Sequence, residues 1–175
     1  MNTINITKVL VGQITELQQI STQTFLSAFS EVNNSEDMQT YIDSSFSIEK
    51  LHEELCNENS QFYFAMLNNK VIGYLKLNTR DAQTEIKDSE GLEIERIYVL
   101  PEFIGQKIGQ LLFDKAMEVA KTTDVSYVWL GVWEHNTRAI KFYERNNFKV
   151  FDKHVFMLGS DKQTDLMMKK ILAAN

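Results

Sequence analysis

Hydrophobic spacing along the first third of the chain predicts one strand followed by helices. Residues 4–11 have the pattern of a short strand, and apolar side chains then recur at helical spacing over residues 14–29. A second helix is predicted to begin at Ser35, a good N-cap that is followed by two acidic residues. Ser47 is predicted to cap a third helix. This part of the chain is therefore expected to be mainly helical.

The pattern then changes to that of strands. Residues 61–67 and 70–77 flank Asn68-Asn69, and this pair predicts a type I′ hairpin turn because Asn tolerates positive φ. The polar segment 79–89 predicts a loop, and residues 93–99 predict a further strand.

Alternation within this last strand predicts which of its side chains share a face. One face is expected to carry Glu93, Glu95, Ile97 and Val99. The opposite face is expected to carry Ile94, Arg96 and Tyr98. Two carboxylates would therefore lie on the face that also holds the apolar end of the strand.

Helices and strands alternate in the rest of the chain. The predicted elements are a helix at 108–121, a strand at 125–132, a helix at 137–145, and strands at 148–158 and 164–171. The strand at 125–132 is almost continuously apolar, as expected at the centre of a sheet that is covered on both faces. The element order β-α-α-(α)-β-β-β-α-β-α-β-β predicts a mixed α/β sheet with helices on both faces.

Composition narrows the class of protein. The chain has 175 residues with one proline and seven glycines, which leaves no room for a linker, so we expect a single domain over residues 1–175. The net charge is −6 and basic residues are scattered, which argues against nucleic-acid binding and suits a cationic substrate or simply solubility. Cys56 is the sole cysteine, so an intramolecular disulfide is excluded. With no long apolar run and no secretory signal, we expect a cytoplasmic protein without a membrane partner.

A possible cofactor site follows the strand at 93–99. Gly105 and Gly109 lie between this strand and the next helix. The first backbone N–H groups of a helix have no partner within the helix, and the helix dipole favours negative charge there. A strand that leads into such a helix is a natural place for a pyrophosphate.

Several segments together resemble the Gcn5-related N-acetyltransferases, the GNAT superfamily, from about residue 61 onward. The matching segments are 97–100, 129–134, Asn136, Ala139, Phe142-Tyr143 and 163–168. Within the superfamily they are most similar to bacterial spermidine/spermine N-acetyltransferases of the PaiA type. The loop departs from the superfamily pattern Gln/Arg-x-x-Gly-x-Gly/Ala, because Ile104 replaces Gln/Arg and Lys107 replaces the middle Gly. Lys107 either attracts phosphate or is an ordinary solvated lysine.

The resemblance implies a GNAT fold and acetyl-CoA as cosubstrate, with no metal. The sheet would be mostly antiparallel, with roughly six to seven strands and two splayed central strands that form the cofactor cleft. The pantetheine arm would bind the backbone near Ile97 and Val99, and the pyrophosphate would bind the loop. The implied cofactor-binding residues are Ile97, Tyr98, Val99, Gly105, Gln106, Lys107, Ile108, Gly109, Gln110, Asn136, Ala139, Phe142 and Tyr143.

The resemblance also implies the catalytic residues. Tyr143 would protonate the leaving thiolate; otherwise it is a packed aromatic side chain. Glu95 is the first candidate for the base and Glu93 the second, because a protonated amine cannot attack. Either carboxylate could instead pair with Arg96 or a lysine.

The acceptor would bind beside the predicted N-terminal helices. Glu31, Asp37 and Tyr41 are the candidates there, and spaced carboxylates suit a polyamine. The alternatives are an N-acetyltransferase acting on protein or peptide amines, and a non-catalytic acyl-CoA-binding sensor. A homodimer is expected by analogy alone.

Overall fold

The computed structural model describes residues 3–30, 34–158 and 161–173 of the chain. The helices are α1 Ile14–Phe29, α2 Ser35–Ser45, α3 Ile48–Cys56, α4 Ile108–Thr122 and α5 Thr137–Arg145. The strands are β1 Ile4–Lys8, β2 Ser60–Leu67, β3 Lys70–Thr79, β4 Gly91–Val99, β5 Tyr127–Trp133, β6 Lys149–Leu158 and β7 Asp161–Ile171. None of the helices in these described segments is long and apolar enough to cross a membrane.

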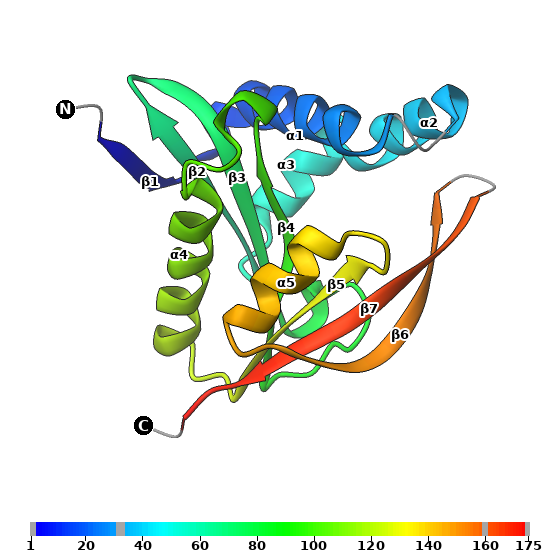
Figure 1. Ribbon diagram of the computed structural model, residues 1–175. Helices are drawn as coiled ribbons and strands as arrows, with labels where there is room; N and C mark the ends of the chain where they lie inside the picture. Colours follow the sequence, from blue (N-terminus) through cyan, green and yellow to red (C-terminus); the bar gives the residue numbers. More distant parts are fainter. Residues whose placement is uncertain (1–2, 31–33, 159–160, 174–175) are drawn as a thin grey trace.

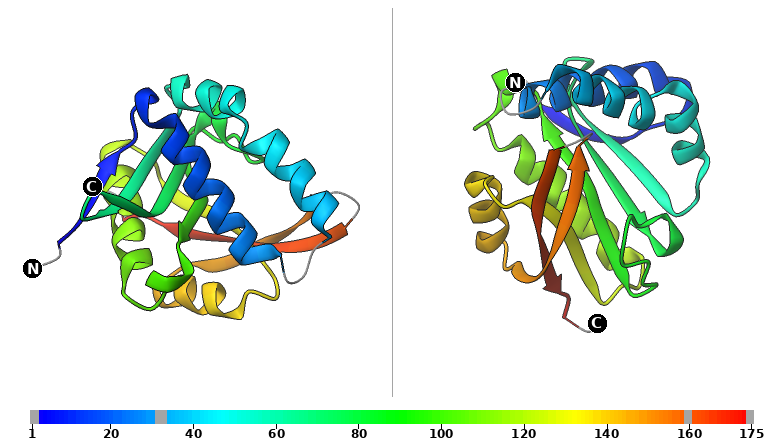
Figure 2. Two further views of the ribbon diagram at one scale, coloured as in Figure 1. Left: turned by 90° about the horizontal axis from the view of Figure 1, so that it is seen from above. Right: turned by 90° about the vertical axis from the view of Figure 1, so that its right-hand side faces the viewer.

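The seven strands form one sheet in the order β1-β2-β3-β4-β5-β7-β6. All neighbouring strands are antiparallel except β4 and β5, which are parallel. Helices α1, α2 and α3 lie on one side of the sheet, and α4 and α5 lie on the other (Figures 1 and 2). The predicted mixed, mostly antiparallel sheet with helices on both faces is confirmed.

Two hydrophobic clusters hold these layers together. On the α4 side, Leu112 and Ala116 are fully buried against Leu75 and Leu77 of β3. On the other side, helices α1 and α3 pack apolar side chains against β2 and β3: this cluster includes Leu17, Ile20, Leu51, Phe62, Phe64 and Tyr74. Burial of apolar surface on both faces of the strands fixes the sheet between the two helical layers.

Local sequence signals placed several boundaries correctly. Asn68 and Asn69 have φ of 48° and 64°, as the type I′ turn requires. The Ser47 side chain accepts a hydrogen bond from the backbone of Lys50 at 3.2 Å and caps α3. The cap of α2 was misplaced by one residue: Asn34, not Ser35, accepts from the backbone N–H of Glu36 at 2.8 Å. Asn34 has the extended backbone of an N-cap, whereas Ser35 is already helical.

A β-bulge at Glu95 overturns the predicted faces of β4. Lys76 pairs with Arg96 but the next residue, Leu77, pairs with Ile94, so Glu95 has no partner on β3. The extra residue reverses the alternation from this point on. Ile97 therefore packs into the α4-side cluster together with Ile94, while both acids form their contacts on the opposite face. The prediction that Glu93, Glu95, Ile97 and Val99 share one face is wrong.

The central strands β4 and β5 separate after a short contact. They pair only from Gly91↔Tyr127 to Glu93↔Trp129, and beyond these residues β5 continues in partnership with β7. Along the same stretch β4 remains bonded to β3, with Val99 opposite Gly73. The predicted splayed central strands are therefore present, and the gap between them passes from one face of the sheet to the other.

Candidate active site

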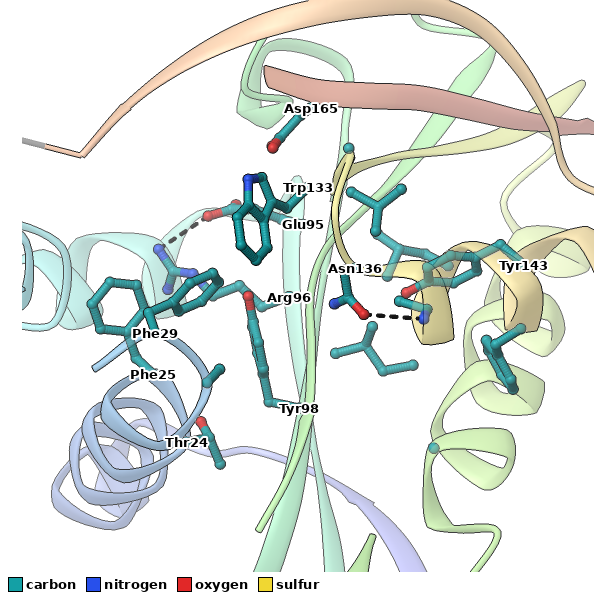
Figure 3. Close-up of a pocket in the computed structure, with 18 of the residues that line it drawn as sticks. Thr24, Phe25, Phe29, Glu95, Arg96, Tyr98, Trp133, Asn136, Tyr143 and Asp165 are labelled. Atoms are coloured by element: carbon teal, nitrogen blue, oxygen red, sulfur yellow. Dashed lines mark hydrogen bonds and ion pairs between the residues drawn. The ribbon is translucent and has the colours of Figure 1, made fainter. Parts of the chain in front are cut away.

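A cleft of about 800 Å³ occupies the opening between β4 and β5. Figure 3 shows side chains reaching it from both layers of helices. Phe25, Phe29 and Tyr41 line it from the α1–α2 side, and Ala139 and Tyr143 line it from α5. The cleft therefore has two walls of different origin, one on each face of the sheet.

The backbone of β4 forms part of the cleft wall. Ile97, Tyr98 and Val99 pair with β3 along one edge, while the other edge has no strand beside it and lines the cleft. An unpaired strand edge needs hydrogen-bond partners from elsewhere. An extended ligand with amide groups can supply these partners by lying along the strand.

The loop before α4 has an unusual backbone. Gly105 has φ of 89° and Lys107 has φ of 63°, so both adopt left-handed conformations just before the helix begins at Ile108. Gly105, Gln106 and Lys107 are exposed, and the first turn of α4 contains no acidic residue. This helix start is therefore accessible and electrostatically suited to an anion.

The predicted cofactor residues divide into two groups. Those that line the cleft are Ile97, Tyr98, Val99, Gly109, Asn136, Ala139, Phe142 and Tyr143. The others belong to the loop and first turn of α4: Gly105, Gln106, Lys107, Ile108 and Gln110. The side chain of Ile108 is only 1% exposed and belongs to the hydrophobic core, so only its backbone could meet a ligand.

Tyr143 reaches the cleft from the last turn of α5. Its side chain is 6% exposed and packs within the α4-side cluster, with its ring directed toward the cleft (Figure 3). Burial raises the pKa of Tyr143 well above the ordinary value, so its hydroxyl keeps its proton. Asn136 caps the same helix, because its side-chain oxygen accepts a hydrogen bond from the backbone of Ala139 at 3.1 Å. A protonated hydroxyl on a well-anchored helix can act as a proton donor.

The opposite wall contains a buried ionic network. Glu95 lies 2.6 Å from Lys76 and 3.0 Å from Arg96, and Glu54 of α3 lies 2.9 Å from Lys76. The side chains of Lys76 and Arg96 are 4% and 8% exposed. Burial acts to raise the pKa of Glu95, but Arg96 and Lys76 outweigh it and lower that pKa below its usual value. Glu95 is therefore a firmly held carboxylate.

Glu93 occupies a different environment although it is only two residues away. Its carboxylate accepts hydrogen bonds from the backbone and hydroxyl of Thr84 at 2.9 and 2.5 Å, and from Asn78 at 3.0 Å. Asn78 also donates to Glu95 at 2.5 Å, so one amide joins the two acids. Glu93 is 3% exposed and forms no ion pair with a cation among the described residues, and burial raises its pKa.

The three residues predicted to bind the acceptor differ in their position relative to the cleft. Tyr41 lines the cleft, where its ring stacks on Phe25 with centroids 4.4 Å apart. Asp37 is partly buried on α2 and is not among the lining residues. Glu31 lies outside the described residues. The acidic side chains that do line the cleft come mainly from strands rather than from the N-terminal helices.

Sequence reasoning missed the polar residues at the far end of this wall. Glu85, Trp133, His154 and Asp165 all line the cleft. They come from the loop after β3, the end of β5, and strands β6 and β7. Only the pairing of these strands brings them together, so no local spacing indicates it. The described residues include no group of histidines, cysteines or acids that could hold a metal ion.

The loop after β3 has a fixed structure. The Gln83 side chain accepts a hydrogen bond from the indole N–H of Trp129 at 2.6 Å, and the Tyr127 hydroxyl donates to Asp88 at 2.9 Å. These bonds tie the loop to β5 at the point where β5 still pairs with β4. The polar segment that the sequence predicts as a loop thus forms a wall of the cleft.

Comparison with known proteins agrees with this geometry. A family model described as the acetyltransferase (GNAT) family matches residues 17–148. An uncharacterized N-acetyltransferase of Lactobacillus delbrueckii subsp. lactis is 41% identical over 172 residues, covering 98% of this chain and 99% of that protein. The spermidine N(1)-acetyltransferase of Thermoplasma acidophilum is 25% identical over 153 residues, covering 85% of this chain and 90% of that protein.

Solved structures give the same result. The crystal structure of the PaiA N-acetyltransferase from Thermoplasma acidophilum, in complex with coenzyme A, superimposes with a TM-score of 0.80 and 25% identity. The match covers 97% of this chain and 99% of that chain. The splayed strands, the open edge of β4 and the extent of these matches lead to one conclusion: the chain belongs to the acetyltransferase (GNAT) family and is an N-acetyltransferase.

Proposed function

We propose that this enzyme transfers the acetyl group of acetyl-CoA to a primary amine of a polyamine such as spermidine or spermine. The observation that carries the proposal is the cleft between β4 and β5, which is open to both faces of the sheet. One wall offers an open strand edge and a helix start suited to an anion. The other wall offers carboxylates and aromatic rings. Two substrates can therefore meet from opposite sides in a ternary complex.

Each part of acetyl-CoA has a matching feature on the wall formed by the free edge of β4, the start of α4 and helix α5. The pantetheine amides would bind the free edge of β4 at Ile97 and Val99, and the pyrophosphate would bind the backbone N–H groups between Gly105 and Gln110. Asn136 and the α5 residues Ala139 and Phe142 would pack beside the pantetheine arm. Coenzyme A is the ligand of the PaiA structure from Thermoplasma acidophilum, which supports this assignment.

The polyamine acceptor fits the second wall. An alkylammonium group carries a positive charge at neutral pH, with a pKa of about 10.4. Four carboxyl groups line the cleft, against the two guanidinium groups of Arg96 and Arg138, and the aromatic side chains beside them suit an apolar spacer. The four acids are Glu85, Glu93, Glu95 and Asp165. The similarity to a spermidine N(1)-acetyltransferase points the same way.

We assign different roles to the two glutamates. Glu95 is paired with cations and stays ionised, so it would attract and orient the ammonium group. Glu93, with its raised pKa, is the better proton acceptor, so we propose it as the base in place of Glu95, the first candidate from the sequence. It would take the amine proton through a water molecule. Acetyl-CoA supplies the thioester whose carbonyl carbon the amine attacks, and the C–S bond then breaks. The hydroxyl of Tyr143 would give its proton to the departing sulfur.

Release of free thiol from acetyl-CoA tests the proposal, with spermidine, spermine, lysine, aminoglycosides and short peptides as acceptors. Turnover confined to the polyamines is the expected result. Preferential turnover of peptides would replace the polyamine with a peptide amine. If no acceptor causes thiol release while acetyl-CoA still raises the melting temperature, the protein would be an acyl-CoA-binding sensor.

A further inference from the structure

Asp165 is a carboxylate of the cleft that takes no part in the proposed catalytic steps. It lies on β7 directly opposite Trp133 of β5 on one side and His154 of β6 on the other. Residues that face each other in antiparallel strands place their side chains on the same face of the sheet. Figure 3 shows the carboxylate next to the Trp133 indole, on the acceptor side of the cleft and away from Tyr143.

The Asp165 carboxylate differs from the other acids of this wall in its partners. Glu93 and Glu95 each accept hydrogen bonds, whereas no donor among the described residues bonds to Asp165. His154 faces it from β6, but the imidazole Nε2 lies 2.9 Å from Glu85 and is engaged there. Burial raises the pKa of Asp165; His154 opposes this rise, and Glu85 adds to it. The carboxylate is thus partly buried and incompletely compensated.

The carboxylate is accessible from the cleft. Its Oδ2 atom lies over the backbone of Gly131, 3.5 Å from the place where a Cβ of residue 131 would be, so the carboxylate itself fills the space above this glycine. Asp165, Trp133 and Gly131 all line the cleft. A carboxylate can attract a cation by direct charge, and an indole close to it can add a cation–π interaction with the same cation.

We propose that Asp165 and Trp133 bind the distal ammonium group of a di- or polyamine acceptor while its reacting amine lies beside Glu95. This inference rests on the proposed function, since it adds a second attachment point for the same acceptor. It makes Asp165 a specificity-determining residue: a substrate with two positive charges gains from it, and a substrate with one does not. The incompletely compensated charge of Asp165 becomes paired only when such a substrate is bound.

Steady-state thiol release with putrescine and butylamine tests this role, because the two molecules have the same carbon chain and differ by one ammonium group. Asp165→Asn should lower kcat/KM for putrescine and spermidine about tenfold or more, mainly through KM, and leave kcat/KM for butylamine and the KM for acetyl-CoA unchanged. Asp165→Glu should restore part of the loss. Asp124→Asn is the matched control: Asp124 is exposed, does not line the cleft, and has a left-handed backbone that Asn tolerates, so its loss should change nothing.

The outcomes separate the inference from the function on which it rests. Equal losses for putrescine and butylamine, or no loss for either, would overturn the role of Asp165 while leaving polyamine acetylation intact. Failure of the wild-type enzyme to acetylate any di- or polyamine would overturn the acceptor class itself. Thermal melting guards against misfolding: removal of an incompletely compensated carboxylate should not lower the melting temperature of Asp165→Asn.

Discussion

The two faces of the sheet solve two different binding problems. On the α4–α5 face the cleft is bounded by an open strand edge, a helix start and a mainly apolar cluster, and Tyr143 is the polar side chain that we assign to the chemistry there. On the α1–α3 face the same cleft is bounded by ionisable side chains from strands β4, β6 and β7 and from the loop after β3. A long cofactor can be held largely by backbone, whereas a small cation must be held by side chains.

The difference between the faces predicts where stability is most vulnerable. Lys76→Met removes one cation from the buried network and leaves Glu54 and Glu95 to share Arg96. We expect the free energy of unfolding to fall by about 3–5 kcal/mol, because breaking a buried ion pair leaves an uncompensated charge. Urea denaturation measures the loss.

The control for this change is Lys50→Met. Lys50 pairs with Glu53 at 3.9 Å on the surface, where both side chains are largely exposed. Loss of this surface pair should lower the free energy of unfolding by less than about 0.5 kcal/mol. A similar small effect for Lys76→Met would show that the network contributes no more than a surface pair, and the contrast between the faces would disappear.

On the opposite face the largest effect should be on rate rather than on stability. Tyr143→Phe removes the proposed proton donor but keeps the buried ring, so kcat should fall about 100-fold, or roughly 2.7 kcal/mol in activation free energy. Binding of acetyl-CoA, followed by thermal shift, should remain. Tyr63→Phe is the matched control, since Tyr63 is buried on the same face but does not line the cleft. Full activity of Tyr143→Phe at every pH would refute the assignment.

The two glutamates should respond to pH in opposite directions. The pKa of Glu95 is lowered by folding, so its stabilising contribution is present above the unfolded value of about 4.3 and is lost at lower pH. Folding raises the pKa of Glu93. The contribution of Glu93 to the free energy of unfolding therefore falls as pH rises above the unfolded pKa of about 4.3.

Unfolding free energies measured between about pH 4 and pH 7 compare the two. Relative to wild type, Glu95→Gln should become more destabilising as pH rises, and Glu93→Gln should become less so. Parallel trends for the two variants would mean that both acids occupy the same electrostatic environment, and the separate roles we assign to them would lose their basis.

The smallest expected effect concerns the cofactor loop. Lys107 occupies a left-handed conformation that glycine adopts without cost, at the position where the superfamily pattern has glycine. Lys107→Gly should raise the free energy of unfolding by about 0.5–1 kcal/mol. Lys107→Asn tolerates the same backbone and also lacks the charge, so weaker acetyl-CoA binding in both variants would identify a phosphate contact. Unchanged binding would make Lys107 an ordinary solvated lysine.

Local signals in the sequence were sufficient for most of the fold. Helix α5 spans the predicted residues 137–145, and Asn147, just beyond it, has φ of 67°. The β2–β3 turn follows from two asparagines. Each of these features depends on neighbouring residues, which is why the sequence predicts it. The bulge at Glu95 depends on how β4 pairs with β3, and no pattern within β4 alone marks the extra residue.

The residues of the site also fall into those that the sequence identifies and those that only the fold brings together. Tyr143, Asn136 and the loop before α4 were identified because they lie in contiguous motifs that resemble a known family. Asp165, His154 and Glu85 come from three separate segments that only the strand order brings together. Thr84, which holds Glu93, lies in a segment that the sequence marks only as polar. Residues that act through tertiary contacts leave no spacing to detect.

The bulge at Glu95 also determines where β4 can be shortened. Deleting Glu95 would let β4 pair with β3 without interruption, with Ile94 still opposite Leu77 and Arg96 still opposite Lys76, so the other side chains would keep their layers. The deletion would remove only the carboxylate that pairs with Lys76 and Arg96. Deleting a residue where the two strands pair one to one, such as Tyr98, would instead turn all the residues on one side of the deletion to the opposite layer. Strand β4 should therefore tolerate a deletion at its bulge better than a deletion elsewhere along its pairing with β3.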